Sequence, residues 1–549
     1  MILTEKIIMA SIKQPPTDER TFNALKRAVI LGEKTHGGLP TKTSLLSAYH
    51  RLLAKKRIKR VPALERLLTR RAVRSLSGIA VVTSLVKPYP CPGECVYCPL
   101  DERMPKSYLA EEPAAMRALT LKFNPYEQMA RRIEALENNG HPTDKIEFIV
   151  KGGTWNSYPL AYQYWFILKS FEACNTCGKT KPKLAKLTET SQLAELKKEL
   201  FKQQRLNETA KHRIIGLTLE TRPDCINKHT IWQMREQGCT RLELGIQHTD
   251  DTILALTKRG HTIARAREAT ELLRNYGYKV DFHLMPQLPG ATPKKDLTMM
   301  ENVFTDPGLK PDMIKIYPCT VVKGSELYDW FVQGKYHAYP TRDLIKIIKI
   351  FKTTIPRYAR VSRLIRDIPG QYIENGNIVT NLRQVIETEM KRDGLMCRCL
   401  RCREIGHVKT DEWTLQELKP ILFIDEYKMR GGTEYFLSFE DKKQRVVFAF
   451  CRLRLVDKPI THPNKKLNSY GAYIRELHTY GQLVRIGKKQ ETSSQHKGLG
   501  KKLLALTEKI VKDHKIKKLA VISGVGVRAY YRRLGYRLEK TYMVKNLKP

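Results

Sequence analysis

Long apolar runs are missing from this sequence. Its best charge-free apolar stretch, residues 76–86, is too short for a membrane-spanning helix, which needs about 20 residues. Glu5 and Lys6 stand where a secretory signal would need an unbroken apolar core. We therefore expect a soluble, non-secreted, cytoplasmic protein without a membrane partner.

Acidic residues are also scarce. The 549 residues include 98 Lys and Arg but 56 Asp and Glu, which gives a formal net charge of +42. This excess is larger than solubility requires and indicates a polyanionic partner, because basic side chains that neutralise phosphates release condensed counterions. Nucleic acid is the expected partner. An anionic membrane surface is the alternative, but no long basic amphipathic helix with bulky aromatics supports it.

Disorder is excluded by the hydrophobic content of 42%, and the length suggests about three or four domains. The first segment, residues 1–75, is basic and predicted to be helical. Its stretch 51–60 has six basic residues in ten and no acid, and it is followed by Arg66, Arg70, Arg71 and Arg74. We favour phosphate contact here over a solvated charged face.

From residue 77 to 322 the chain repeats an apolar run, a turn and a helical stretch. Six such repeats predict a parallel sheet covered by helices, either an open six-stranded β/α barrel or a doubly wound sheet. In both folds, ligands bind beyond the carboxyl ends of the strands. The predicted strands lie in residues 78–86, 145–153, 213–223, 241–248, 279–290 and 313–322.

A second α/β pattern occupies the C-terminal part. After residue 324 the pattern is irregular up to a cysteine cluster near residue 397, and strands are then expected in residues 436–441, 445–455, 472–481, 517–524 and 541–547. The predicted domains are therefore a basic N-terminal segment (1–75), a barrel domain (76–365), a linker with the cysteine cluster (366–410) and a second α/β domain (411–549).

Twelve cysteines in such a chain indicate metal or redox chemistry rather than disulfides. Cys91, Cys95 and Cys98 lie in a C-x3-C-x2-C loop directly after the first predicted strand. Four-iron clusters normally have four thiolate ligands, so three leave one iron open for an external ligand. This loop resembles that of the radical S-adenosylmethionine (SAM) superfamily, in which the open iron binds SAM; a zinc knuckle is the alternative.

Other residues near the strand ends are candidates for contacts with SAM. Gly152 and Gly153 end the second strand, where glycine permits close backbone approach and where the superfamily contacts the SAM amino group. Four further side chains could hold the ribose or the carboxylate, or could form internal ion pairs instead; these are Glu220, Arg222, Glu243 and Gln247.

A glycine loop in the second domain is the other strong motif. Gln495, Gly498 and Gly500 form a Q-x-x-G-x-G loop between a predicted strand and a helix. Backbone N–H groups at such a helix N-terminus can bind the CoA pyrophosphate, so the loop resembles that of GNAT-type acetyltransferases. In that fold Tyr531 would lie near the CoA sulfur. The alternative is that one of Tyr530 and Tyr531 packs in the core of the domain and has no contact with CoA.

The cysteines near residue 397 predict a zinc site. Cys397, Cys399 and Cys402 supply three thiolates, and tetrahedral zinc takes four ligands. Cys319 is the best candidate for the fourth ligand; three free thiols are the alternative. We expect no site at the remaining pair, Cys174 and Cys177.

Taken together, the motifs resemble one family, the catalytic subunit of Elongator, in a bacterial or archaeal form. This family modifies the wobble uridine of tRNA. The resemblance covers the chain from about residue 77 to its end. It includes CVYCP (95–99), TLETRPD (218–224), KRGHT (258–262), ELHTYG (476–481) and QHKGLG (495–500). The chain differs from eukaryotic members in its tighter cysteine spacing and its additional thiolates.

The resemblance implies a 4Fe-4S cluster on Cys91, Cys95 and Cys98, together with SAM, acetyl-CoA and zinc as ligands. It implies an acetyl-derived group transferred to carbon 5 of the wobble uridine in a tRNA anticodon stem-loop. The candidate catalytic residues are Tyr531, Tyr530 and Glu476. The implied acetyl-CoA contacts are Lys145, Glu476, Leu477, His478, Thr479, Gln495, Gly498, Leu499, Gly500, Lys501 and Tyr531.

Two other functions remain as alternatives. A protein-lysine acetyltransferase would use the second domain alone, with Glu476 or a water as the base and Tyr531 as the acid. An RNA-binding protein with a structural cluster would merely sense acetyl-CoA. Both a stand-alone monomer and a homodimer are compatible with the sequence, and the sequence does not indicate which tRNAs are modified.

Overall fold

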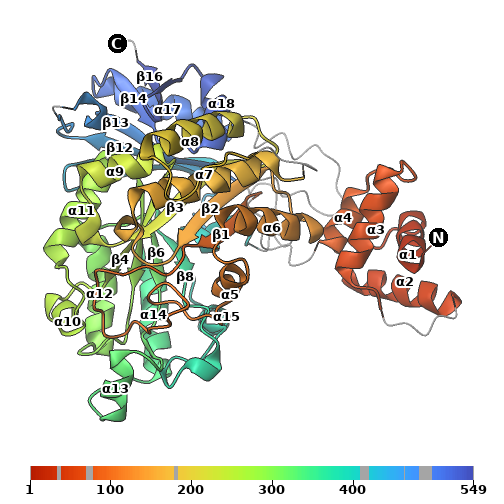
Figure 1. Cartoon of the computed structure of the whole chain (residues 1–549), viewed down its shortest axis with the longest axis horizontal. Coiled ribbons are helices and arrows are strands. Elements are labelled where there is room, and N and C mark those ends of the chain that lie inside the picture. The colour runs from red at the N-terminus through yellow and green to blue at the C-terminus, as the bar shows by residue number, and fades with distance from the viewer. Residues whose placement is uncertain are drawn as a thin grey trace.

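The computed structural model describes residues 2–33, 39–69, 78–178, 184–408, 419–462, 464–480 and 498–547. They form an N-terminal helical bundle, a parallel sheet surrounded by helices and a second, mixed sheet (Figure 1). In Figure 1 the bundle lies to one side of the parallel sheet and the second sheet lies at its top. Within the described ranges, no helix has the length and apolar character needed to cross a membrane.

The N-terminal segment is helical, as predicted, and has an apolar core of its own. That core includes Ile7, Phe22, Tyr49 and Leu64. The Thr69 hydroxyl donates a hydrogen bond of 3.5 Å to the Gly140 carbonyl, which connects the bundle to the parallel-sheet domain. The helices are α1 (Leu3–Lys13), α2 (Glu19–Gly32), α3 (Lys42–Ala54) and α4 (Pro62–Leu68).

The parallel sheet has the six predicted strands and a seventh that the sequence did not indicate. They are β1 (Ala80–Leu85), β2 (Lys145–Lys151), β3 (Arg213–Thr221), β4 (Arg241–Gln247), β5 (Lys279–Leu284), β6 (Met313–Ile316) and β8 (Arg360–Arg363). The prediction of an irregular region after residue 324 was wrong here. The reason is that β8 is a four-residue strand with an arginine at each end, so it has no apolar run.

The strand order decides between the two predicted architectures. The strands are paired in the order β1-β2-β3-β4-β5-β6-β8, and all of these pairs are parallel. A doubly wound sheet would reverse its order at a switch point. Among the described residues β1 and β8 do not pair, so the sheet is an open barrel. Two short strands, β7 (Thr320–Val321) and β9 (Asn375–Gly376), form a separate antiparallel pair.

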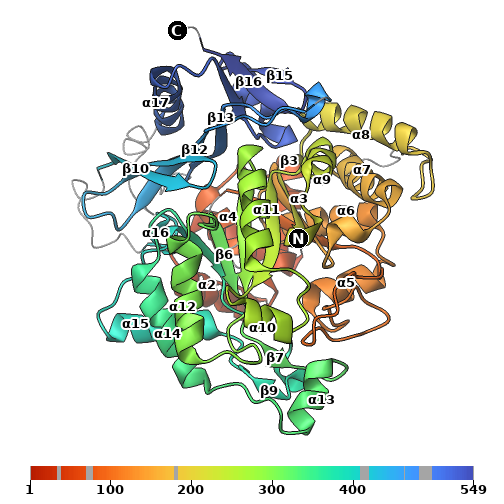
Figure 2. The ribbon, with the colours of Figure 1, turned by 90° about the vertical axis from the view of Figure 1, so that its left-hand side faces the viewer.

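Helices cover the outside of this barrel (Figure 2). α7 and α8, which follow each other along the chain between β2 and β3, lie next to each other. The predicted linker segment packs on the same core through Leu382, Ile386 and Leu400. The helices are α5 (Pro113–Thr120), α6 (Pro125–Asn138), α7 (Leu160–Thr176), α8 (Leu193–Asn207), α9 (Lys228–Glu236), α10 (Asp251–Leu256), α11 (Ile263–Asn275), α12 (Pro293–Thr305), α13 (Glu326–Val332), α14 (Thr341–Thr354), α15 (Leu382–Arg392) and α16 (Leu400–Arg403).

The second sheet has seven strands, of which β10 and β15 were not predicted. Its order is β10-β11-β12-β13-β14-β16-β15, and β13 and β14 form a parallel pair among antiparallel neighbours. The elements are β10 (Ile421–Met429), β11 (Gly432–Glu440), β12 (Val447–Val456), β13 (Ala472–Thr479), α17 (Leu499–Asp513), β14 (Lys518–Val521), α18 (Arg528–Arg532), β15 (Arg537–Glu539) and β16 (Tyr542–Asn546).

A buried ion cluster joins the second sheet to the amino ends of the barrel strands. Arg475 of β13 donates two hydrogen bonds of 2.7 Å to Asp312, which precedes β6. It also donates to Glu434 of β11 at 2.8 and 3.0 Å. Arg274 of α11 lies 3.1 Å from Glu434 and 3.3 Å from Asp312. These four side chains are fully buried, and Arg452 and Arg454 complete the cluster.

Contacts of the backbone also hold the second sheet close to the barrel. A Cβ atom on Gly524, after β14, would lie 1.9 Å from the Ile215 carbonyl oxygen in β3, so this contact requires glycine. Arg235 of α9 donates hydrogen bonds to the carbonyls of Ser523 at 3.0 Å and Thr541 at 2.7 Å. The second sheet is therefore held firmly against the barrel.

Replacing Arg475 with Met should destabilise the whole protein. Asp312 and Glu434 would each lose a buried counter-charge, and breaking a buried ion pair in this way costs about 3–5 kcal/mol. Arg537→Met, at an exposed position of β15, is the matched control and should change the free energy of unfolding little. Urea unfolding of both variants measures the effect, and equal stabilities would show that the cluster does not hold the sheets together.

Candidate active site

One large cavity connects the two motifs found in the sequence. Its volume is about 1820 Å³, and its lining includes Cys91 and Gly153 at the carboxyl ends of the barrel strands. At the other end the same cavity is lined by Glu476, Gly500 and Tyr531 of the second sheet. The barrel interior lies between these ends, so both candidate binding loops open into a single chamber.

The first cysteine loop follows β1. The Cys91 sulfur lies 3.7 Å from the Thr154 hydroxyl, and Arg259 donates a hydrogen bond of 3.3 Å to the Cys95 sulfur. A hydrogen bond from Cys98, together with the Arg259 charge, lowers the pKa of Cys95 to about 4. Cys95 is therefore predisposed to the thiolate form, which is the form that binds metal.

The three sulfurs of the first cysteine loop do not form one compact group. Sulfurs around a single zinc, bound at about 2.3 Å, would lie roughly 4 Å apart. Within the described part of the chain, Cys91, Cys95 and Cys98 do not form a group with all sulfurs inside 4.8 Å of one another. All three cysteines line the chamber, and three thiolates are the donor set of a four-iron cluster with one open iron, so the residues fit the predicted 4Fe-4S group.

Gly152 and Gly153 stand where close backbone approach was expected. Their φ angles are +134° and +86°, which favour glycine. A Cβ on Gly152 would lie 2.1 Å from the Val86 side chain. Gly153 lines the chamber, as the predicted contact with a ligand requires.

The barrel interior contains charged side chains instead of an apolar core. Glu243 of β4 is fully buried and forms ion pairs with Lys151 of β2 and Lys315 of β6. His283 lies 3.1 Å from the same carboxylate, and Lys151 lies 3.0 Å from Glu220. Burial lowers the pKa of Lys315 to about 8 and that of His283 to about 4. Burial opposes ionisation of Glu243, but the two lysine charges keep its pKa well below the usual value.

This network resolves part of the uncertainty about SAM contacts. Oxygen and nitrogen atoms of Glu220, Glu243 and His283 lie within 4.8 Å of one another, but the two ammonium groups already neutralise them, which disfavours a metal ion. Glu243 thus forms the internal ion pairs that were the alternative to ligand contact. Arg222 pairs with Asp224 at 3.0 Å, and the buried Gln247 amide oxygen has no partner among the described residues.

At the other end of the chamber, two strands of the second sheet separate. β13 and β14 are paired at two positions, from Tyr473 and Ile474, and α17 begins beside them. Gly498 precedes α17 with a φ of +97°, and Leu499, Gly500 and Lys501 form its first turn. The first N–H groups of a helix have no partner within the helix, which is the arrangement that the predicted pyrophosphate contact needs. Gln495 lies outside the described residues.

Glu476 and its neighbours lie on β13, facing the barrel. The Glu476 carboxylate accepts hydrogen bonds from Lys279 at 3.2 Å and Arg452 at 2.9 Å. Burial raises its pKa, but these two charges outweigh burial and lower the pKa to about 2. His478 stacks on Phe450, and burial lowers its pKa to about 4. Leu477 and Thr479 also line the chamber.

The two candidate tyrosines differ in their surroundings. Tyr531 is 6% exposed and belongs to the apolar core of the second sheet, whereas Tyr530 is half-buried. Both line the chamber, and their ring centroids lie 5.2 Å apart. Burial raises the pKa of Tyr531, so its hydroxyl is neutral. Lys145, at the start of β2, lines the chamber from the barrel side.

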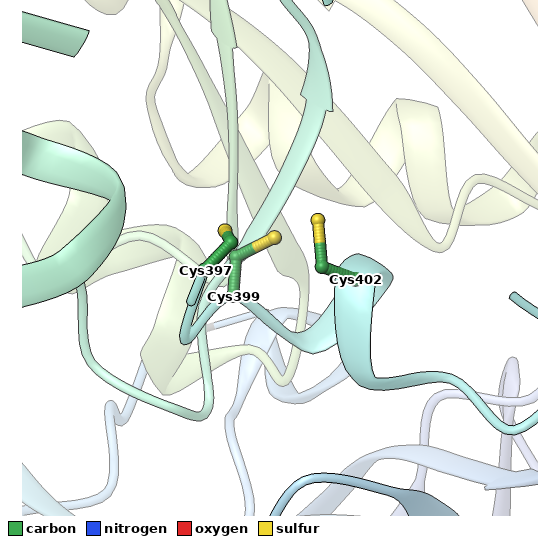
Figure 3. A group of neighbouring side chains, drawn as sticks. All are labelled: Cys397, Cys399 and Cys402. Carbon is green, nitrogen blue, oxygen red and sulfur yellow. The ribbon is translucent and has the colours of Figure 1, made fainter. Parts of the chain in front are cut away.

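The second cysteine group is compact. The sulfurs of Cys397, Cys399 and Cys402 all lie within 4.8 Å of one another, as the neighbouring side chains in Figure 3 show. Hydrogen bonds from Cys397 and Cys402 hold the pKa of Cys399 well below its usual value. In the described ranges no other Cys, His, Asp or Glu joins this group.

Cys319 is not the fourth member, so that prediction was wrong. It is fully buried in a separate cluster with Cys95 and Val96, beneath the first cysteine loop. Burial raises its pKa to about 12, which keeps the thiol protonated. The Cys319 amide donates a hydrogen bond of 2.8 Å to the Pro286 carbonyl, which ties this segment to the turn after β5.

Several chamber residues were not predicted from the sequence. They are Lys151, Arg259, Asp281, His283 and Lys315. A signal was present, because charged residues alternate with apolar ones in KVDFHL (279–284) and MIKI (313–316). Alternation places such side chains on one face of a strand. In a barrel covered by helices, that face is the interior.

Comparison with known proteins agrees with this geometry. The family model for the Radical SAM superfamily matches residues 89–301, and that for the Radical_SAM C-terminal domain matches residues 311–392. The tRNA uridine(34) acetyltransferase of Methanocaldococcus infernus is 41% identical over 490 residues, which are 88% of each chain. Elongator complex protein 3 of Homo sapiens is 35% identical over 493 residues, 88% of this chain and 86% of the human one.

A solved structure is similar over a comparable length. It is Methanocaldococcus infernus Elp3 with its N-terminal residues 1–46 deleted. The TM-score is 0.71 at 38% sequence identity, covering 86% of this chain and 100% of that one.

Proposed function

Because the chain belongs to the family of tRNA uridine(34) acetyltransferases and Elongator complex protein 3, we propose that it modifies carbon 5 of the wobble uridine in tRNA with a group derived from acetyl-CoA. It is a Radical SAM enzyme that acts as an acyltransferase on tRNA. The observation that carries this proposal is the single chamber lined by Cys91 at one end and by Gly500 and Tyr531 at the other.

Cys91, Cys95 and Cys98 would hold a 4Fe-4S cluster, and Gly152 and Gly153 leave room for SAM beside it. When bound, the cluster and SAM supply radical chemistry, which suits carbon 5 of uridine because this atom is a poor target for acid–base catalysis. The buried Nη1 atom of Arg222 has no hydrogen-bond partner among the described residues and lies against Gly93 of the cysteine loop, so it would be available to a ligand carboxylate.

The second sheet would bind acetyl-CoA as a GNAT-type domain. The free N–H groups of Leu499, Gly500 and Lys501 are placed for the pyrophosphate at the start of α17. A Cβ on Gly500 would lie 3.2 Å from the Thr479 methyl and 3.5 Å from the Tyr530 hydroxyl, so a larger residue would crowd this part of the chamber. The gap between β13 and β14 then directs the acyl end toward Tyr531 and Lys145.

Charged residues of the barrel would act between these two ends. Lys151 and Lys315 lie in the chamber, where Glu220 and Glu243 neutralise their charges and hold the two side chains in position. The edge strand β1 and Arg117 of α5 also line the chamber. The tRNA base must leave its stack to enter.

Glu476 is poorly suited to the role of general base. With a pKa of about 2 and hydrogen bonds from Lys279 and Arg452, it does not accept a proton near neutral pH. We therefore assign it a positioning role, in which it fixes Lys279 at the junction of the two sheets. This disfavours the protein-lysine acetyltransferase with Glu476 as its base.

The N-terminal bundle would bind the tRNA backbone. Its basic run exposes Lys55, Lys56, Arg57, Lys59 and Arg60, and Arg60 pairs with Glu65 at 2.9 Å. The bundle contacts the end of α6, next to β1 and the open side of the barrel (Figure 1).

Cys397, Cys399 and Cys402 would hold a zinc ion with a fourth ligand from elsewhere. The close grouping of their sulfurs and the low pKa of Cys399 support this assignment. The site lies where α16 joins the barrel core, so the metal would stabilise that junction.

The proposed function is tested by measuring 5′-deoxyadenosine formation, CoA release and uridine modification in one reaction. We expect Cys91→Ala to abolish 5′-deoxyadenosine formation and uridine modification while acetyl-CoA binding is retained. Tyr531→Phe keeps the ring and should slow CoA release and uridine modification together, with SAM binding unchanged. The control Cys177→Ala, at a half-buried cysteine outside the chamber, should behave as wild type. Full modification of the tRNA by either chamber variant would contradict the proposal.

Replacing the five basic residues 55–57, 59 and 60 with Ala should weaken tRNA binding and reduce its salt dependence. Five lost phosphate contacts correspond to a change of roughly 3 to 5 in the slope of log affinity against log salt. Five exposed lysines of the second sheet domain provide the control; these are Lys509, Lys512, Lys515, Lys517 and Lys518. If the two variants, each with five substitutions, show the same decrease in the slope of log affinity against log salt, the N-terminal run is an ordinary charged face.

Cys399→Ser should lower the zinc content and the stability together. A structural zinc contributes directly to folding, so a weakened site lowers the unfolding temperature. Cys177→Ser is the matched control. Metal analysis and thermal unfolding are the measurements, and a wild-type protein purified without zinc would rule out this site.

A further inference from the structure

Arg259 is a buried guanidinium that lies directly against the cysteine loop. It follows α10 and is 6% exposed. Its Nε and Nη2 atoms donate hydrogen bonds to the Gly245 carbonyl at 3.2 and 2.6 Å, and its Nη1 atom donates one of 3.3 Å to the Cys95 sulfur. These hydrogen bonds fix the orientation of the guanidinium between β4 and the cysteine loop.

The barrel makes room for this arginine. A Cβ on Gly245 of β4 would lie 2.3 Å from Arg259 Nη2, so any other residue there would displace the guanidinium. Gly245 has no positive φ that would require glycine for backbone reasons. The glycine therefore serves the position of Arg259.

No carboxylate among the described residues forms an ion pair with Arg259. The groups near it that can carry negative charge are Cys95, Cys98 and Tyr97. The neighbouring Arg222 differs, because Asp224 pairs with it at 3.0 Å. An uncompensated buried charge costs several kcal/mol, so Arg259 requires an anion. The cysteine thiolates are the anion that the structure offers.

We propose that Arg259 is the counter-ion of the iron–sulfur cluster and raises its reduction potential through the hydrogen bond to Cys95. This inference rests on the cluster proposed above for Cys91, Cys95 and Cys98. One-electron reduction by a low-potential donor adds a negative charge to the cluster, and a fixed cation nearby stabilises that state more than the oxidised one. Hydrogen bonds to cluster sulfurs and buried charge are known determinants of such potentials. Arg259 is thus a positioning and tuning residue.

The test compares three variants of the full-length protein after anaerobic reconstitution with iron and sulfide. Arg259→Met removes both the charge and the hydrogen bond, and Arg259→Lys keeps the charge. Lys258→Gln is the matched control, because it removes a charge from the adjacent residue, which is exposed and paired with Glu326 at 2.7 Å. A redox titration followed by electron paramagnetic resonance gives the midpoint potential, and iron analysis gives the cluster content.

We expect Arg259→Met to shift the reduction equilibrium at least tenfold toward the oxidised cluster, which is about 59 mV for one electron. Arg259→Lys should shift it less, and Lys258→Gln should match wild type because solvent screens its charge. If Arg259→Met fails to retain iron while Arg259→Lys retains it, the requirement for a counter-ion is supported.

Two results would overturn the inference. One is a wild-type potential in Arg259→Met at full iron content. The other is loss of iron from both Arg259 variants but not from Lys258→Gln, which would mean that the arginine only shapes the loop. A wild-type protein that binds no iron at all would instead contradict the proposed cluster.

Discussion

The buried pairing of Arg475 with Asp312 and Glu434 is the constraint on which the rest of the structure depends. Asp312 belongs to the barrel and Glu434 to the second sheet, and one guanidinium satisfies both carboxylates. Burial opposes ionisation of Asp312, but Arg274 and Arg475 hold its pKa well below the usual value. Separating the sheets would expose or unpair these charges, so a hinge at this junction is energetically unfavourable. The distance between the two ends of the chamber is therefore fixed by the fold.

A fixed junction explains why the barrel interior is polar. A closed β/α barrel normally fills its centre with branched apolar side chains. Here the second sheet covers the amino ends of the strands, and Glu243, Lys151 and Lys315 occupy the centre as compensated charges. The chamber thus stays open from the cysteine loop to the start of α17. A barrel filled with apolar side chains would separate a radical generated at one end from an acyl group bound at the other.

The sequence predicted local features well and long-range pairing poorly. The strands of the barrel could be recognised because each is a short apolar run, and the two candidate loops stood out because C-x3-C-x2-C and Q-x-x-G-x-G are contiguous motifs. Arg475 and Asp312 are 163 residues apart, and no local pattern indicates that they meet. Cys319 was misplaced for the same reason, since its neighbours are set by the Pro286 turn rather than by spacing. Strand β8 was missed because its four residues have arginine at both ends.

The most direct measurement follows the acetyl carbons. The intact protein would be incubated anaerobically with SAM, reductant, tRNA and acetyl-CoA labelled with ¹³C at both acetyl carbons, and the tRNA nucleosides and the protein would be examined by mass spectrometry. If the two ends of the chamber act on one substrate, both labelled carbons should appear together in 5-carboxymethyluridine. Label found on protein lysines, with unmodified uridine in the tRNA, would contradict a shared active site.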